Sequence, residues 1–213
     1  MHTASHDLLA PLANIEIGIG VMNEVKVTDL QLNKFLNVIN SSVKKFRSLI
    51  NDIATIAKLE SDMITMEMVD VNEIINNIEW SLDDKIKLSG AVINRDLEVK
   101  HILFSKKNLR SIVYNLISNG IKFKSDERPV INIHTTKQRD NVILPVQDNG
   151  MGIPKGDLDK IFNMYGRLHH DIEGHGIGLY LAKKIVDAVS GNIIVESVPG
   201  KGSKFIIYLK AEP

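Results

Sequence analysis

Two amides and a lysine share one face of a predicted helix. Apolar residues at helical spacing give this segment a buried stripe: Leu109, Ile112, Val113, Leu116, Ile117 and Gly120. Asn115, Asn119 and Lys122 are spaced i, i+4 and i+7, which places them together on a second, exposed stripe. Amide oxygens can hold a hydrated magnesium ion, and a lysine can reach phosphate oxygens. For this helix taken alone, a solvated polar face is the simpler explanation.

Two glycine-rich segments change that weighing. DNGMGIP (148–154) follows a predicted strand, so Asp148 lies at a strand end, where its carboxylate can accept a hydrogen bond from an exocyclic amine such as that of adenine. GHGIGL (174–179) begins a helix, and the free N–H groups of a helix start favour phosphate. The polar, His-rich stretch 163–173 between them is typical of a mobile lid. Each segment alone could be a turn, but together they indicate a nucleotide site.

In this order, the segments resemble the motifs of sensor histidine kinases. They are NLISNGIKF (115–123, the N box), DNGMGIP (the first Gly box), IFNMYGRL (161–168, the F box), GHGIGLYLAKKIV (174–186, the second Gly box) and the usual family ending, ESVPGKGSKFIIYL (196–209). Residues 106–209 are similar to the family's ATP-binding domain of the Bergerat fold. With the histidine segment described below, the resemblance covers almost the whole chain.

The resemblance implies ATP and Mg²⁺ as cofactors. Asn119 would be a magnesium ligand assisted by Asn115, Asp148 would bind adenine, and Lys122 and Arg167 would contact phosphates. We assign nucleotide binding to Asn115, Asn119, Lys122, Phe123, Asp148, Gly150, Gly152, Ile153, Tyr165, Arg167, Gly174, His175, Gly176, Ile177, Gly178 and Leu179. For Phe123 and Tyr165, packing in the core is the alternative that we favour, as it is for Trp80, Phe104 and Phe162.

Asn115 bears on the type of reaction. ATPases of the gyrase type, which are similar in fold, carry a Glu one turn before the magnesium-binding Asn, and this Glu activates water as a general base. Asn115 is an amide and cannot take a proton at neutral pH. Attack by water is therefore disfavoured, and another nucleophile is needed.

His6, in SHDLLAPL (5–12), is the expected nucleophile. A neutral imidazole is nucleophilic near pH 7, and Asp7 can fix its tautomer through a hydrogen bond. The segment resembles the family's H box, which implies that His6 is phosphorylated and that the phosphoryl group passes to an aspartate of a response-regulator receiver domain. We therefore assign catalytic roles to His6, Asp7 and Asn115. An ordinary surface histidine is the alternative.

Four residues depart from the family pattern. Leu9 replaces a basic residue, and Ala10 replaces a Thr or Asn that orients water in many members, so we expect weak or absent phosphatase activity. Gly120 replaces a common Ala, which costs about 1 kcal/mol of helix propensity. Pro145 falls inside a predicted strand and implies an edge strand or a bulge.

Heptad patterns predict two helices near the amino end. Apolar residues alternate by four and three in two stretches: Leu8, Leu12, Ile15, Ile19 and Met22, then Leu32, Leu36, Ile39, Val43, Phe46, Ile50, Ile53 and Ala57. A polar turn at 23–31 separates them, so we expect an antiparallel hairpin that joins a second copy in a dimeric four-helix bundle. Packing of the hairpin on its own chain is the alternative.

After about residue 61 the periodicity is mixed. We expect strands near 66–71, 91–97, 130–136, 142–147, 193–197 and 204–209, and helices near 72–88, 105–123 and 178–189. This pattern is typical of an α/β sandwich with a mixed sheet, so the predicted fold class is α+β. Residues 1–62 would form the dimerisation and histidine phosphotransfer domain, and residues 63–213 the catalytic ATP-binding domain.

The composition excludes several classes of protein. The 213 residues carry 26 basic and 26 acidic side chains, which gives no electrostatic case for nucleic-acid binding. The absence of Cys excludes disulfides, thiolate zinc sites and a thiol nucleophile. No apolar run reaches the roughly 18 residues of a membrane span. We expect a cytoplasmic fragment without a membrane segment, from a full-length protein that can still be membrane-linked.

Two other functions remain open. A non-catalytic dimerisation and docking module, a pseudokinase with weak or no nucleotide turnover, would explain the unusual Leu9, Gly120 and Pro145. An ATP hydrolase of the same fold would release phosphate without using His6.

Overall fold

The computed structural model describes residues 15, 17, 19, 20, 32, 34, 36–43, 46, 47, 50, 65–166, 168 and 176–210. The chain divides into two compact units, Met1–Asp62 and Met63–Pro213. Five of the predicted site residues lie outside the described residues: His6, Asp7, Arg167, Gly174 and His175. The roles predicted for them, and for the two units, stay predictions.

Every described residue of the first unit is helical. Leu36, Val43 and Ile50 recur every seven residues and are buried. Ile19, from the earlier heptad stretch, forms one buried cluster with Val43 and Ile50. The two predicted helical stretches are therefore in contact through one heptad position, while their joining into a four-helix bundle stays a prediction.

The other heptad position of the same helical stretch is not covered by the described residues of the first unit. Leu32, Ile39 and Phe46 also recur every seven residues, and their side chains are 47%, 44% and 49% exposed. We call these three residues the exposed stripe. Of the two apolar heptad positions, one is therefore buried and the other is exposed, whereas a complete coiled-coil seam buries both.

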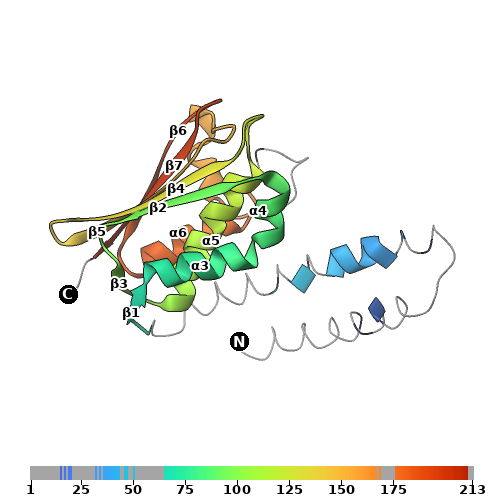
Figure 1. The fold of residues 1–213 in the computed structure, drawn as a ribbon, viewed down its shortest axis with the longest axis horizontal. Helices are drawn as coiled ribbons and strands as arrows, with labels where there is room; N and C mark the ends of the chain where they lie inside the picture. The colour runs from blue at the N-terminus through green and yellow to red at the C-terminus, as the bar shows by residue number, and fades with distance from the viewer. Residues whose placement is uncertain are drawn as a thin grey trace. The chain divides into compact units, whose positions relative to one another are not determined.

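The second unit alternates strands and helices. In chain order it contains β1 (Glu67–Asp70), α3 (Val71–Ser81), α4 (Asp83–Ser89), β2 (Val92–Leu97), β3 (His101–Phe104), α5 (Lys106–Lys122), β4 (Val130–Gln138), β5 (Asn141–Asp148), the short 3₁₀ helices η1 (Lys155–Asp157) and η2 (Lys160–Phe162), α6 (Gly178–Ala188), β6 (Asn192–Val198) and β7 (Gly202–Lys210). Figure 1 shows α3, α5 and α6 on one face of the main sheet.

The main sheet is mixed, as predicted. Its five strands lie in the order β2-β4-β5-β7-β6, and β1 pairs with β3 in a separate two-stranded sheet. β2 is parallel to β4, whereas the other neighbours in the main sheet are antiparallel. The α+β class and the mixed sheet are thus confirmed for this unit.

The core lies between the helices and the sheet. From α5 it takes the predicted stripe, with Ile121 in addition: Leu109, Ile112, Val113, Leu116, Ile117, Gly120 and Ile121. Alternate residues of the central strands face this stripe: Ile131, Ile133, Leu144, Val146, Phe205, Ile207 and Leu209. Each fully buried aliphatic side chain of this kind contributes about 1.5–3 kcal/mol. This burial fixes the orientation of α5, so its second stripe faces away from the core.

The helix predicted at 72–88 is two helices. Asp70 caps the first, α3, by accepting hydrogen bonds from the N–H groups of Asn72 at 2.8 Å and Glu73 at 3.2 Å. The chain leaves helical geometry at Leu82, whose side chain is buried, and α4 then runs to Gly90, which ends it at φ 68°. Apolar residues at helical spacing, Ile78, Leu82 and Ile86, continue across this break, so the sequence pattern did not show it.

The prediction for Pro145 is wrong. β5 is the central strand of the sheet, and Pro145 pairs with Ile206 of β7. On the β4 side the pairing passes from Ile133↔Val146 to Thr136↔Ile143 with equal spacing on both strands, so there is no bulge. Instead, the β4–β5 pairing is interrupted at Pro145, which has no N–H to donate.

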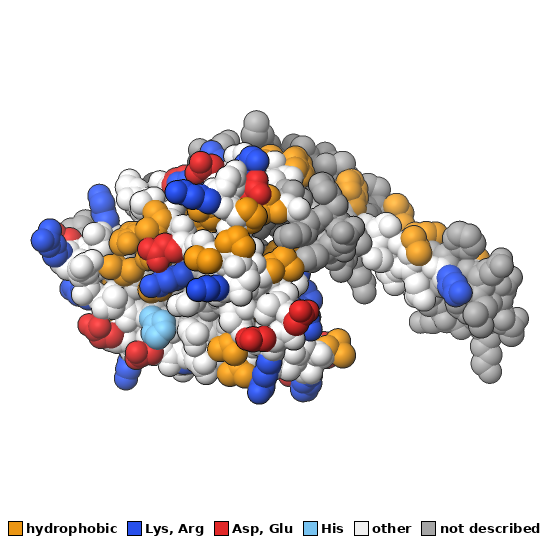
Figure 2. Space-filling model, turned by 90° about the horizontal axis from the view of Figure 1, so that it is seen from above, with side chains coloured by type: hydrophobic (Ala, Val, Ile, Leu, Met, Phe, Trp, Pro, Cys, Tyr) orange, Lys and Arg blue, Asp and Glu red, His pale blue; other side chains and the backbone are white. Residues whose placement is uncertain are grey.

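The surface of the second unit departs from expectation at one aromatic residue. Trp80, expected to pack, is 84% exposed on α3, whereas Phe104 is buried as expected. Figure 2 shows one face of this unit, where hydrophobic, acidic and basic side chains are interspersed. Among the described residues, no helix has the length and apolarity needed to cross a membrane.

Candidate functional site

The amide of Asn115 lies against the start of α6. A Cβ built on Gly178, the first residue of α6, would lie 2.6 Å from Oδ1 of Asn115. Only a glycine therefore allows the first turn of α6 to approach this amide so closely. Two segments that are more than fifty residues apart in sequence, the predicted N box and second Gly box, meet at this point.

The donor set of α5 fits a hydrated magnesium ion. Asn115 and Asn119 are both half-buried, and within the described part of the chain neither side chain has a hydrogen-bond partner. Neither amide is committed to another protein group in the described residues, so both oxygens are available to solvent or to a ligand. Among the described residues no cluster of three His, Cys, Asp or Glu could hold a metal. Mg²⁺ would thus depend on amide, water and phosphate oxygens, which it accepts.

Lys122 continues the same stripe near the end of α5. Its Nζ lies 4.4 Å from the centroid of the Phe123 ring, within cation–π range. The Phe123 ring and the Lys122 ammonium group are therefore in contact at the carboxyl end of the helix.

The carboxylate of Asp148 is held by the backbone. Its Oδ1 accepts hydrogen bonds from the N–H groups of Gly150 at 2.8 Å and Ser203 at 3.2 Å. In the described structure, both of these bonds reach Oδ1, which leaves Oδ2 to accept from a ligand. Burial raises the pKa of the Asp148 carboxyl above its ordinary value, and the two backbone hydrogen bonds partly offset this effect.

The first Gly box packs against the end of α5. Gly150 has no room for a side chain, because a Cβ would meet the carbonyl oxygen of Phe123. The same carbonyl oxygen accepts a hydrogen bond from the N–H of Met151 at 2.9 Å. The loop that begins with Asp148 therefore lies directly beside the helix that carries the two amides.

The other side of this loop meets the turn between β6 and β7. Gly152 has φ 69° and lies against the carbonyl of Val198. The N–H of Ile153 donates to Oγ of Ser197 at 2.8 Å, and the N–H of Gly200 donates to the carbonyl of Met151 at 2.7 Å. The loop is thus held on both sides by hydrogen bonds.

The F box meets the second Gly box. The N–H of Tyr165 donates to the carbonyl of Gly176 at 3.0 Å, and both residues have positive φ, 63° and 69°. The Tyr165 ring is exposed, so the expectation that it packs in the core is wrong. Ile177 is buried, which leaves its backbone as the group that could meet a ligand, and Leu179 is half-buried.

Similarity to known proteins agrees with this geometry. Residues 105–213 match the family described as histidine kinase-, DNA gyrase B- and HSP90-like ATPase. The chain belongs to this ATPase family. The phytochrome-like protein Cph1 of Synechocystis is 34% identical over 208 residues, covering 96% of this chain and 28% of Cph1. The sensor protein kinase WalK of Staphylococcus aureus is 31% identical over 222 residues, covering 98% of this chain and 52% of WalK.

The predicted resemblance to sensor histidine kinases is thereby confirmed. The chain spans about half or less of the length of these curated relatives. Two solved structures share the fold: full-length ShkA in complex with AMPPNP, with a TM-score of 0.83 at 21% identity over 100% of this chain and 46% of that one, and the Acinetobacter baumannii histidine kinase AdeS, with a TM-score of 0.71 at 20% identity over 96% of this chain and 98% of that one.

Three polar residues that shape the loop in this member of the ATPase family were not predicted from the sequence. Ser203 orients the Asp148 carboxylate through its N–H, and Ser197 accepts the N–H of Ile153. Asn149 hydrogen-bonds through its side chain to the backbone of residues 128 and 130. Asn149 is part of the DNG motif, and that motif was the only sign in the sequence that it has a role.

Proposed function

We propose that this chain is the catalytic core of an ATP-dependent protein histidine kinase of a two-component system. The observation that carries the proposal is Asn115, a half-buried amide against the start of α6, at the position where a water-activating ATPase would need a carboxylate. A site with a nucleotide fold and no general base there favours transfer to a protein nucleophile over transfer to water.

Three groups of residues would hold MgATP. Oδ2 of Asp148 would accept a hydrogen bond from the adenine amine, while the N–H groups of Gly150 and Ser203 fix the orientation of the carboxylate. Asn119 and Asn115 would hold Mg²⁺, which would supply positive charge to the phosphates. Lys122 and Arg167 contact phosphate oxygens, together with the backbone from Gly174 to Leu179 at the start of α6. The remaining predicted residues, Phe123, Gly152, Ile153 and Tyr165, border the same loops.

His6 would then attack the γ-phosphorus in line. A bond forms between phosphorus and an imidazole nitrogen as the bond to the β–γ bridging oxygen breaks, and ADP leaves. Asp7 would accept a hydrogen bond from the N–H of the other ring nitrogen, which fixes the tautomer and leaves the attacking nitrogen unprotonated. The phosphoryl group passes next to an aspartate of a receiver domain. A cytoplasmic location of this part of the protein belongs to the same proposal, because ATP and this partner would be met there.

The exposed stripe supports a homodimer. Leu32, Ile39 and Phe46 present three apolar side chains at heptad spacing, each close to half exposed. A second copy of the same stripe would cover them by forming the four-helix bundle that the heptads predict.

The structure removes two of the three features that supported a non-catalytic module. A Cβ on Gly120 would lie 3.0 Å from Ile131 and 3.1 Å from Asp148, so the glycine allows α5 to approach the adenine-binding strand end. Pro145 is accommodated in the middle of the sheet without a bulge. Neither residue indicates a damaged site, so the kinase is the better-supported function.

Labelled ATP tests the proposal. Incubation of the chain with γ-labelled ATP and Mg²⁺ should give protein-bound label that is labile in acid and stable in alkali, as expected of phosphohistidine. The label should disappear in His6→Gln and in Asn119→Ala. Measurable ATP binding without any label would favour the docking module. Phosphate release that survives His6→Gln and falls in Asn119→Ala would instead identify an ATP hydrolase.

A further inference from the structure

Asn149 connects the Asp148 loop to the segment that follows α5. Its Oδ1 accepts the N–H of Val130 at 2.8 Å, and its Nδ2 donates to the carbonyl of Arg128 at 2.9 Å. Its own carbonyl accepts the hydroxyl of Ser125 at 3.2 Å. One residue therefore makes three hydrogen bonds to three positions of a single connecting segment.

This connecting segment determines how two halves of the site are spaced. It begins at the end of α5, just after Lys122, and runs into β4 at Val130. Asn149 directly follows Asp148, so its bonds set the distance from the Asp148 carboxylate to the last turn of α5. The bond from Met151 N–H to the Phe123 carbonyl, 2.9 Å, lies on the same boundary but involves only backbone. Asn149 thus contributes two side-chain hydrogen bonds to this boundary, and the Ser125 hydroxyl contributes one more.

We propose that Asn149 is a positioning residue for the nucleotide: it sets the separation between the adenine acceptor Asp148 and the phosphate- and metal-binding groups Asn119 and Lys122. This inference rests on the proposed function. Asn149 itself uses both ends of its amide on the protein backbone, so it acts through the groups on either side of it. Its removal leaves the Val130 N–H and the Arg128 carbonyl without their partner.

Loss of the Asn149 side chain should raise the dissociation constant of a ligand that spans both halves of the site more than that of a ligand that uses only one half. Once the adenine half of a ligand is bound, the phosphate half binds well only if the distance between the two halves of the site matches that of the ligand. Mg·ADP engages both halves, whereas adenosine engages only the Asp148 half. A loss of stability alone would weaken both ligands by the same factor.

The test compares dissociation constants of Mg·ADP and adenosine for the full chain and for Asn149→Ala, by calorimetry for Mg·ADP and by NMR titration for adenosine. We expect Asn149→Ala to weaken Mg·ADP about tenfold and adenosine by less than about threefold. Asn149→Asp keeps the acceptor for Val130 and loses the donor to Arg128, so its effect on Mg·ADP should lie between those of wild type and Asn149→Ala. Circular dichroism at the titration temperature establishes that each variant is folded.

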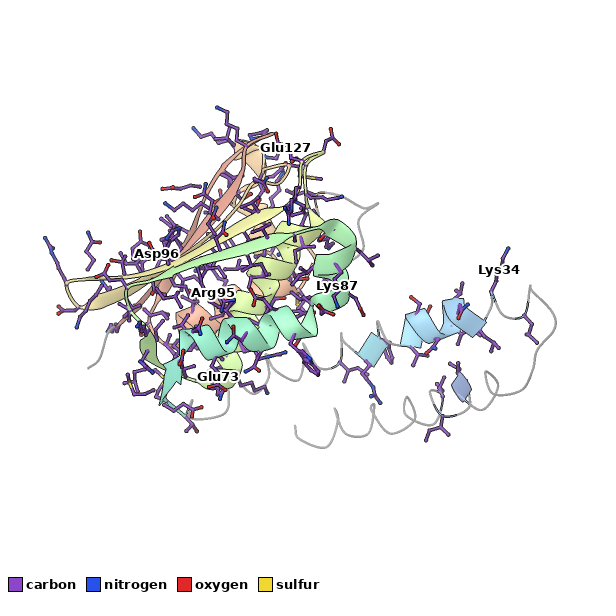
Figure 3. All side chains as sticks on the ribbon, in the orientation of Figure 1. Lys34, Glu73, Lys87, Arg95, Asp96 and Glu127 are labelled. Carbon is purple, nitrogen blue, oxygen red and sulfur yellow. The ribbon has the colours of Figure 1, made fainter. Side chains whose placement is uncertain are left out.

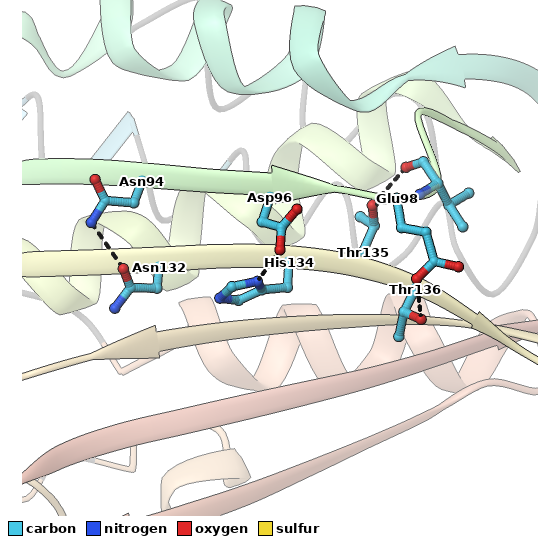
Figure 4. Close-up of polar contacts among 8 residues, drawn as sticks. Asn94, Asp96, Glu98, Asn132, His134, Thr135 and Thr136 are labelled. Atoms are coloured by element: carbon cyan, nitrogen blue, oxygen red, sulfur yellow. Dashed lines mark hydrogen bonds and ion pairs between the residues drawn. The ribbon is translucent and has the colours of Figure 1, made fainter.

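Asn132→Ala is the matched control. It removes the 2.9 Å hydrogen bond between the Asn94 and Asn132 side chains, which joins two neighbouring strands (Figure 4), and should leave both constants unchanged. Equal weakening of Mg·ADP and adenosine in Asn149→Ala, or no weakening of either, would overturn the positioning role. Failure of the wild-type chain to bind Mg·ADP would overturn the proposed function itself.

Discussion

Asp148 makes adenine binding sensitive to acid. Burial raises the pKa of this carboxyl above its ordinary value of 3.8. Protonation removes an acceptor for the adenine amine, so adenosine affinity should fall on acidification, starting at a higher pH than for an ordinary Asp. NMR titrations of adenosine across the acidic range would measure this fall. Asp148→Asn should bind adenosine more weakly at neutral pH and lose this pH dependence. An identical pH profile in the variant would show that another group titrates.

The same pKa has an opposite consequence for stability. Because the folded-state pKa of Asp148 lies above the unfolded value, the folded chain binds more protons between the two values. The contribution of Asp148 to the free energy of unfolding therefore falls as pH rises through that window, and the deficit persists at neutral pH. Asp148→Asn should be more stable than wild type at pH 7, with the difference vanishing below the window. Urea unfolding followed by circular dichroism measures both.

Gly178 tests the placement of the Asn115 amide. A Cβ at this position would displace the end of the Asn115 side chain, which lies 2.6 Å away, without striking backbone. Gly178→Ala should therefore keep the fold and weaken Mg·ADP by roughly tenfold to a hundredfold. Gly156→Ala, where a Cβ meets no atom within 4 Å, is the matched control and should bind normally. Normal binding by Gly178→Ala would mean that Asn115 has no contact with the ligand.

At the residue scale, the sequence identified types of side chain better than their neighbours. Asn115, Asn119 and Asp148 could be proposed as ligand-binding residues because an amide or carboxylate in such a motif has few other uses, and their roles stay predictions. The contact between Asn115 and Gly178 was not predictable, since it depends on how α5 and α6 pack across the sheet. Asn149 was missed because its partners are backbone groups, which carry no signal in the sequence.

Arg95 joins an edge strand to a helix. From β2 its guanidinium reaches α3, where NH1 donates to the amide oxygens of Asn72 and Asn76, and NH2 pairs with Glu79, all at 2.7 Å. Figure 3 shows Arg95 between β2 and α3. The ion pair is partly shielded from solvent, and one planar guanidinium makes all three bonds. Arg95→Met should therefore lower the free energy of unfolding by about 1–2 kcal/mol.

The control for Arg95 is an exposed pair of the same kind. Lys87 and Asp83 pair at 2.6 Å on the surface of α4, with both side chains mostly in solvent. Lys87→Met should leave the free energy of unfolding almost unchanged, because solvent screens this pair. Urea unfolding by circular dichroism compares the two, and equal effects would show that Arg95 does not hold α3 to the sheet.

At the element scale, long periodic segments were predicted well and short ones were not. α5 and α6 begin and end within a residue or two of expectation, because each has an apolar stripe and a defined start. β3 was missed because four residues contain too few alternations to distinguish a strand from a turn. The prediction of an edge strand or bulge at Pro145 was wrong because it assumed that a residue without an N–H cannot lie in a central strand. The sheet instead tolerates a local interruption of the β4–β5 pairing.

The exposed stripe predicts how the whole molecule assembles. In the proposed dimer, Phe46→Glu would place a charge in the apolar seam, so we expect it to weaken self-association of the chain by about tenfold or more. Sedimentation velocity measures the change. Val38→Glu is the matched control, because Val38 is 63% exposed and lies off the stripe. Equal dissociation in both variants would contradict the stripe as the dimer contact.

At the scale of the whole molecule, the sequence predicted the class of each unit from its periodicity. Heptads indicated helices, and mixed patterns indicated an α+β unit, which the sheet order confirms. Sheet order itself was not predictable, because the β2–β4 pairing is parallel and joins strands separated by β3 and α5. The pairing of strands that are distant in sequence depends on tertiary packing, which the periodicity of each strand does not indicate.

Trp80 is the single tryptophan of the chain and projects from α3 into solvent. Its indole therefore emits from an aqueous environment already in the native state, and intrinsic fluorescence would give little change when the second unit denatures. The same exposure makes the indole a native optical reporter. A protein that covers α3 would shift its emission to shorter wavelength and shield it from iodide quenching, without any added label.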